Sequence, residues 1–246
     1  MKKTGLAQTW RSLQQLPPSL PQNSQSGFTI IECLIAIVIV SILMTALSPV
    51  IVLSVATRVQ SRRVELASQA ARAYIDGVRN GTIDPPSNTI LLNNYLQLDN
   101  FAGVLPPPTG AGSLSSCPTT AGNQYCQNSS TPGATPSLYC IDIDGGGCNN
   151  SITSKDLVIQ AFRSVTSTST DANQGYLLGI RVYRADAFND NVSLSQTKPP
   201  NNATPPKKLI FTGGLGDRKA PLVEMTTEIV TPKTNYASFC GRLGGC

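Results

Sequence analysis

A single carboxylate stands at the start of a long apolar run. Glu32 directly precedes 24 residues, Cys33 to Ala56, that contain no charged side chain. An ionisable group in an apolar segment is expensive to keep there, so it is usually paired or functional. The chemistry open to Glu32 is therefore an ion pair with a cation from outside the run, or a favourable interaction with the positive end of its own helix.

Seven cysteines offer a second kind of chemistry. Cys33 lies in the apolar run, where we expect a free, apolar-packed thiol, with lipidation as the alternative. The other six are Cys117, Cys126, Cys140, Cys148, Cys240 and Cys246. An even number of cysteines in an exported part predicts disulfides in an oxidising compartment, with fifteen connectivities if all six pair. The first four could form two local pairs, Cys117 with Cys126 and Cys140 with Cys148, and the last two could close a small C-terminal loop, but the sequence does not choose among the connectivities.

The residue types argue against an enzyme or a metal site. The chain has no histidine, which removes Ser-His-Asp and Cys-His catalysis, and its cysteines show no CxxC spacing for zinc. Asp142 and Asp144, in DIDGGGCNN, are an incomplete version of a calcium loop, and we interpret them as a glycine-rich surface turn. The glycines between 213 and 216 are likewise interpreted as a turn. We expect no enzyme activity, no cofactor and no metal.

Composition and charge are typical of a surface or secreted protein. Only 13% of the 246 residues are charged, and the formal net charge is +5. Lys2, Lys3 and Arg11 precede the apolar run in a stretch without acidic residues, so the remainder of the chain carries +2. This charge does not predict nucleic acid as a partner.

The elements that position these residues begin with a long helix. The uncharged run would be about 36 Å long as a helix, enough to span a bilayer and too long for the apolar region of a signal peptide. Arg58, Arg62 and Arg63 follow it and could meet lipid headgroups or acidic positions on neighbouring subunits. The helical pattern then continues to Asn80-Gly81, which gives one helix of about 50 residues. Its expected apolar face comprises Val55, Val59, Leu66, Ala70, Ala73 and Tyr74.

The rest of the chain predicts a β-rich head. Residues 82–156 are rich in Pro, Gly, Ser and Asn, and we expect a long irregular region held by disulfides. Strands are predicted at Leu157–Val165, Tyr176–Ala185, Lys208–Thr212 and Leu222–Val230. The predicted fold class is α+β, with a long N-terminal helix, part membrane-spanning and part amphipathic, packed on an antiparallel sheet.

The N-terminal region resembles type IV pilin-like proteins. Gly27, Phe28 and Glu32 match the prepilin cleavage and methylation motif, in which a Gly precedes an aromatic first mature residue and a Glu stands fifth. Pro49 lies where many pilins carry a helix-kinking proline. The resemblance implies cleavage after Gly27 by a prepilin peptidase, N-methylation of Phe28, and pairing of Glu32 with the Phe28 amine during assembly. It also adds weight to a disulfide near the C-terminus.

This resemblance implies an organisation and a set of partners. The expected segments are a leader at 1–27, a transmembrane or filament-core helix at 28–57, an amphipathic continuation at 58–81 and a disulfide-containing head at 82–246. Implied partners are the prepilin peptidase, other pilin or pseudopilin subunits, an inner-membrane assembly platform and membrane lipid. The expected location is the inner membrane, with a cytoplasmic N-terminus and a periplasmic head, and then a filament at the cell surface.

Two functions of different classes remain open from the sequence. The first is a minor pilin or pseudopilin subunit of a filament that serves motility or secretion. The cysteine-rich head also resembles cyanobacterial pseudopilins of hormogonium polysaccharide secretion, which would imply polysaccharide export. The alternative is a membrane-tethered surface binding protein that does not polymerise.

Overall fold

The structure is a computed structural model of the 246-residue chain, and it describes residues 27, 29–92, 101–110, 114, 116–127, 137–166, 170–197 and 217–242. The chain divides into two compact units, Met1–Pro49 and Val50–Cys246. Each unit is described by itself below.

A single long helix, α1, runs from Ile30 to Asn80. It ends where Gly81 takes a φ of +77°, a conformation that favours glycine, and where the Ile83 amide donates to the Gly77 carbonyl at 3.0 Å. The predicted stop at Asn80-Gly81 is therefore confirmed. The other described helices are short: α2 (Phe101–Val104), the 3₁₀ turns η3 (Ala172–Gln174) and η4 (Ala185–Phe188), and α3 (Tyr236–Arg242).

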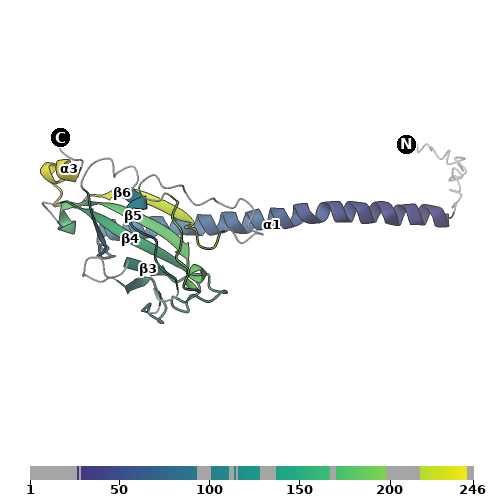
Figure 1. Cartoon of the computed structure of the whole chain (residues 1–246), viewed down its shortest axis with the longest axis horizontal. Helices are drawn as coiled ribbons and strands as arrows, with labels where there is room; N and C mark the ends of the chain where they lie inside the picture. Colours follow the sequence, from purple (N-terminus) through teal and green to yellow (C-terminus); the bar gives the residue numbers. More distant parts are fainter. Residues whose placement is uncertain are drawn as a thin grey trace, which may run out of the picture. The chain divides into compact units, whose positions relative to one another are not determined.

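The described strands form one six-stranded sheet in the second unit (Figure 1). They are β1 (Thr89–Leu91), β2 (Gln124–Gln127), β3 (Ser137–Ile141), β4 (Leu157–Val165), β5 (Tyr176–Arg184) and β6 (Val223–Ile229). Strands β2 to β6 follow one another as an antiparallel meander. The short β1 pairs in parallel with the end of β4, from Thr89 opposite Arg163 to Leu91 opposite Val165.

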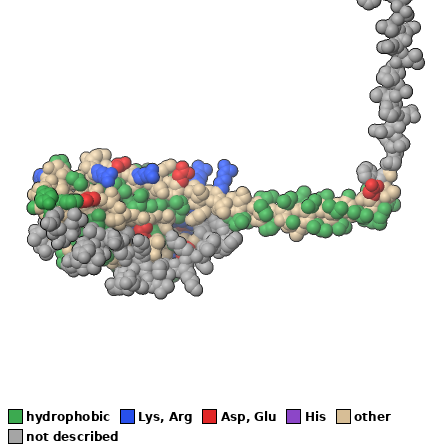
Figure 2. Space-filling view, turned by 90° about the horizontal axis from the view of Figure 1, so that it is seen from above, with side chains coloured by type: hydrophobic (Ala, Val, Ile, Leu, Met, Phe, Trp, Pro, Cys, Tyr) green, Lys and Arg blue, Asp and Glu red, His purple; other side chains and the backbone are tan. Residues whose placement is uncertain are grey.

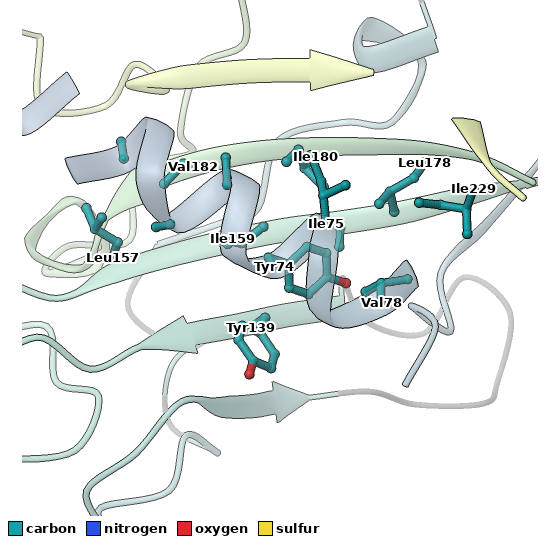
Figure 3. Packing of buried hydrophobic residues seen from close by; sticks show 14 of the residues in the cluster. Tyr74, Ile75, Val78, Tyr139, Leu157, Ile159, Leu178, Ile180, Val182 and Ile229 are labelled. Carbon is teal, nitrogen blue, oxygen red and sulfur yellow. The ribbon is translucent and has the colours of Figure 1, made fainter. Parts of the chain in front are cut away.

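One face of the sheet is covered by the C-terminal part of α1 (Figure 3). Tyr74, Ile75 and Val78 extend from the helix among apolar side chains of the strands, including Ile159 and Ile180. The same side of the helix also carries small buried residues, Ala67, Ala70 and Ala71. Small side chains let the helix backbone approach the sheet closely, and the larger residues beyond them fill the space that remains.

The buried face of α1 differs from the one predicted. Ala70 and Tyr74 are buried as expected, but Leu66 is 37% exposed and Val59 is 40% exposed. At about 100° per residue, the buried positions 67, 70, 71, 74, 75 and 78 share one side of the helix, positions 59 and 66 lie just beyond its edge, and position 73 lies further round. The amphipathic continuation is confirmed, but weighting the larger side chains placed its face wrongly.

The opposite face of the sheet is also buried, beneath the segment around α2. The Phe101 and Phe162 rings lie 5.2 Å apart between centroids. Arg181, on β5, is fully buried and donates from Nη2 to the Leu105 carbonyl oxygen at 2.7 Å. Gly179 lies opposite Phe162 in the β4–β5 pair, and a Cβ there would be 2.3 Å from the Phe162 Cε2 atom. The absence of a side chain at Gly179 therefore makes room for this second core.

Residues 82–156 are less irregular than predicted. They contribute β1, β2, β3 and α2. These elements span only three to five residues each, which is too short for a periodic pattern to emerge against a background of Pro, Gly, Ser and Asn. In contrast, the predicted strand at Leu157–Val165 is confirmed as β4. Those at Tyr176–Ala185 and Leu222–Val230 are confirmed as β5, one residue shorter at its end, and β6, one residue shorter at each end. The predicted strand at Lys208–Thr212 lies outside the described residues.

Candidate functional site: the start of the N-terminal helix

The first turn of α1 is capped by Thr29. The Glu32 backbone amide donates to the Thr29 Oγ1 atom at 3.3 Å and to the Thr29 carbonyl oxygen at 3.0 Å. The sequence Thr-Ile-Ile-Glu has the spacing of a capping box, in which a Thr side chain satisfies an amide three residues later. Sequence reasoning missed this cap, although its signal is present at the boundary of the apolar run. The helix can thus begin at Ile30 without help from the Glu32 carboxylate.

The Glu32 carboxylate is exposed, and none of its described contacts explains why a charged residue stands in this apolar surface. Among the residues that the structure describes, it has neither an ion pair nor a side-chain hydrogen bond. Its neighbours along the helix are exposed apolar side chains, such as Ile31 at 64% and Ile35 at 55%. Because the Glu32 carboxylate has no partner within the described part of the chain, it is available to a cation of another molecule.

Gly27 lies just before this turn, and the fold does not require glycine there. A Cβ built on Gly27 would meet nothing within 4 Å, and Gly27 is not among the glycines of positive φ. Nothing in the described part of the fold therefore explains a glycine at this position. Phe28, the expected first mature residue, lies outside the described residues.

The N-terminal stretch of α1 presents apolar side chains to its surroundings, and hydrophobic atoms cover it in the face that Figure 2 shows. Within the described part of the chain, α1 is the one helix long and apolar enough to cross a membrane. Two of its hydroxyl groups are bonded within the helix: Ser41 Oγ donates to the Ile37 carbonyl and Thr45 Oγ1 donates to the Ser41 carbonyl. Such internal bonds suit these two side chains to an apolar environment.

The remaining predicted residues of this region are placed by the same helix. Pro49 lies inside α1, about 17 residues after Glu32, and the bend that the resemblance implies there stays a prediction. Cys33 is exposed and is a free thiol.

The head cysteines are brought together by the loops around β2 and β3. The structure pairs Cys117 with Cys126 and Cys140 with Cys148. Both disulfides belong to a second buried cluster that also contains Leu138, Val158, Tyr183 and Phe188. Cys240 is disulfide-bonded as well. Its expected partner, Cys246, lies outside the described residues.

The two aspartates of DIDGGGCNN shape a loop. The Asp142 carboxylate accepts backbone N–H bonds from Gly122, Gly145 and Gly147 at 3.0, 2.7 and 3.1 Å. These bonds, led by the one from Gly122, lower the pKa of Asp142. Asp144 accepts from the Gly146 amide at 3.2 Å. The carboxylates organise a turn, as the interpretation as a surface turn expects, and their oxygens lie within 4.8 Å of each other and of one from Asp156. The expectation that they hold no metal stays a prediction.

Comparison with known families decides the class of the protein. Residues 22–48 match the prokaryotic N-terminal methylation motif, a segment that includes Gly27, Phe28 and Glu32. The match indicates a type IV pilin-like protein. No curated protein and no solved structure matches the chain significantly.

The type IV pilin-like class accounts for the features of the N-terminal helix. The motif implies processing by a prepilin peptidase and assembly with other pilins. Together with the apolar part of α1, it indicates membrane anchoring. It also suggests a structural rather than an enzymatic protein. The α+β architecture, with a long apolar N-terminal helix and disulfides in the loops of an antiparallel sheet, is pilin-like.

Proposed function

We propose that this chain is a subunit of a type IV pilus-like filament. In this proposal the peptidase cuts after Gly27 and methylates the Phe28 amine, and Glu32 pairs with the Phe28 amine of a neighbouring subunit. Residues 28–57 cross the inner membrane once before assembly, with the N-terminus in the cytoplasm and the head in the periplasm. An assembly platform in that membrane then transfers the helix into the filament core.

The observation that carries the proposal is the exposed carboxylate of Glu32, which lies in an apolar surface and has no partner among the described residues. When such helices bundle, the carboxylate enters a low-dielectric environment in which an unpaired charge costs several kcal/mol. An ammonium group at the N-terminus of a neighbouring chain would remove that cost. Because the apolar side chains alone would allow many staggers, the ion pair would select one axial register.

The open position at Gly27 supports processing at this point. A peptidase must bring its catalytic groups close to the backbone it cuts, and glycine permits such close approach. Since the fold leaves space for a Cβ at Gly27, the constraint is better explained by an enzyme that binds the segment than by packing within the chain.

The process in which the filament takes part is a separate question. Motility, secretion and, from the resemblance of the head, polysaccharide export stay predictions, as do the roles of minor pilin and pseudopilin. The alternative of a tethered binding protein that does not polymerise makes no use of the Glu32 carboxylate and is separated from the proposal by experiment.

The experiment is mass spectrometry of the N-terminal peptide in two fractions from cells that make this protein, sheared surface filaments and membranes. We expect a peptide that begins at N-methylated Phe28 in the filament fraction. A methylated peptide confined to the membrane fraction would support the tethered alternative. A chain that retains residues 1–27 in both fractions would contradict the processing step itself.

A further inference from the structure

A groove of about 790 Å³ opens at the end of the sheet where α1 arrives from its apolar stretch. Three segments that are far apart in sequence meet there: α1 at Arg62 and Arg63, the loop before β4 at Lys155, and the end of β5 at Arg184. The pairing of Leu157 with Arg184 places the start of β4 beside the end of β5 at this edge. The groove thus collects four cationic side chains.

The groove also holds two carboxylates, Asp144 and Asp156, whose oxygens lie within 4.8 Å of each other and of Asp142. Asp156 is 1% exposed, and its carboxylate accepts hydrogen bonds from the Ile143 amide and from Ser154 Oγ, at 3.1 and 3.0 Å. Asp144 is exposed and accepts from a loop amide. Because Asp156 is committed to the loop, the acidic charge that faces solvent in the lining is that of Asp144 alone among the described residues.

Two of the four cations, Arg62 and Lys155, have no ion pair among the described residues. Arg184 is paired with Asp186. Burial lowers the pKa of Arg63, and the nearby positive charge of Arg184 adds to this effect. Both Arg62 and Lys155 are exposed. The positive charges of Arg62 and Lys155 are therefore accessible to a ligand in the groove.

The lining between the cations is apolar. Ile152 is 71% exposed, Ile143 is 40% exposed and Leu66 is 37% exposed. Isolated exposed apolar residues are ordinary, but here three of them line one groove with a basic rim. This combination suits a ligand with an anionic head and an adjoining apolar part. A groove of this size also falls in the range that encloses small organic ligands.

The position of the groove along α1 identifies the source of such a ligand. The uncharged run ends at Ala56, and Arg62 follows about 9 Å further along the helix at 1.5 Å per residue. The headgroup layer of a bilayer extends roughly 5–8 Å beyond the hydrocarbon on each side, and arginine side chains reach several ångströms towards it. If Cys33 to Ala56 occupy the hydrocarbon, the groove opens at headgroup level.

We propose that this groove binds the headgroup of an anionic phospholipid while the chain is anchored in the membrane. The phosphate lies between Arg62 and Lys155, with Arg63 and Arg184 beneath it, and the glycerol region contacts Ile152 and Leu66. The head is thereby held against the membrane surface in one orientation before assembly. The proposal goes beyond filament formation and does not depend on it.

The test uses the full chain in non-ionic detergent micelles and measures retained lipid by native mass spectrometry during titration with phosphatidylglycerol or phosphatidylcholine. One basic side chain at an anionic surface contributes about 1 kcal/mol, which is about fivefold in affinity. Arg62→Gln with Lys155→Gln should therefore weaken retention of phosphatidylglycerol about 25-fold. Raising the salt concentration to about 0.5 M should weaken it in the unaltered chain, since the screening length falls well below 10 Å.

The matched control is Arg72→Gln with Lys233→Gln. It removes the same two residue types, one from α1 and one from an exposed loop, at positions outside the groove. We expect retention in this control to equal that of the unaltered chain.

Three outcomes would overturn the proposal: equal losses in the two double variants, equal retention of the two lipids by the unaltered chain, and no loss in the groove variant. Binding of soluble polygalacturonate instead of lipid, abolished by the groove substitutions, would show an acidic-glycan site and would overturn it as well. The measurement involves no filament, so its failure leaves the filament proposal intact.

Discussion

Replacing Glu32 by glutamine isolates the charge on which the filament proposal depends. Glutamine keeps the length of the side chain and leaves the Thr29 cap intact, because that cap uses the backbone amide of residue 32. The carboxylate makes no side-chain hydrogen bond or ion pair among the described residues, and the core of the head begins 35 residues later, at Ala67. Glu32→Gln therefore changes little within one subunit beyond its interaction with the helix dipole, about 0.3–1 kcal/mol.

The expected effect on assembly is larger. In a filament core the substitution leaves the Phe28 ammonium buried without a counter-charge, and removal of one partner of a buried pair costs about 3–5 kcal/mol. Each subunit contact would lose about two to three and a half powers of ten in its association constant. An effect of this size would remove the variant from filaments while leaving the unfolding temperature of the head unchanged.

The assay compares sheared filaments with membranes by immunoblot and follows N-terminal processing by mass spectrometry. Two controls separate charge from helix stability. Thr29→Ala removes the cap, at a cost of about 1 kcal/mol in helix stability, but keeps the carboxylate. Glu65→Gln removes an exposed charge from the same helix, beyond the apolar run.

We expect Glu32→Gln to be processed but absent from filaments, and both controls to assemble. Normal assembly of Glu32→Gln would refute the ion-pair reasoning. If Thr29→Ala were lost from filaments to the same degree, the role of residue 32 would be helix initiation rather than pairing.

Three further predictions concern processing, the disulfides and pH. Gly27→Val should accumulate the uncut precursor, measured as the intact mass, with the head still folded because a Cβ there meets no other atom; a mature product would count against cleavage after Gly27. Cys140→Ser with Cys148→Ser should lower the free energy of unfolding of the head by about 2–3 kcal/mol, since the bond closes a short loop. Cys33→Ser, which removes a free thiol, is its control in thermal unfolding, and equal effects of the two changes would contradict the assignment. Burial raises the pKa of Tyr74 and Tyr125 above the usual value near 10, so head stability should be constant to about pH 9 and fall at higher pH. Unfolding in urea from pH 7 to pH 11 measures this, and a stability that is flat across the range would refute it.

The features that sequence predicted well are those with a local physical cause. The apolar run, the helix stop at Asn80-Gly81 and the three long strands each have a composition or a period that suffices to define them. The cleavage motif is similarly local, because its meaning lies in the spacing of Gly27, Phe28 and Glu32. These features need no knowledge of what packs against them.

The features that sequence did not predict depend on contacts between distant segments. The buried side of α1 is set by how closely Ala67 and Ala71 let the helix approach the sheet, and hydrophobic size alone indicates a different side. The basic groove joins Arg62 to Lys155 and Arg184, which lie about 90 to 120 residues further along the chain. Only the register of the sheet, with Leu157 opposite Arg184, brings them together.

The interlocking of α1 with the sheet determines where the chain can be cut without losing the head. Tyr74 is fully buried, and its hydroxyl group hydrogen-bonds to that of Tyr125 at 2.7 Å. A protease or a gene truncation that removed residues up to about position 55 would take away, among the described residues, exposed side chains alone. A cut after Val78 would remove the part of α1 that covers one face of the sheet and would expose Ile159 and Ile180 to water. The apolar stretch and the part that packs on the sheet therefore belong to one continuous helix, and a cut that spares the core of the sheet lies ahead of Ala67.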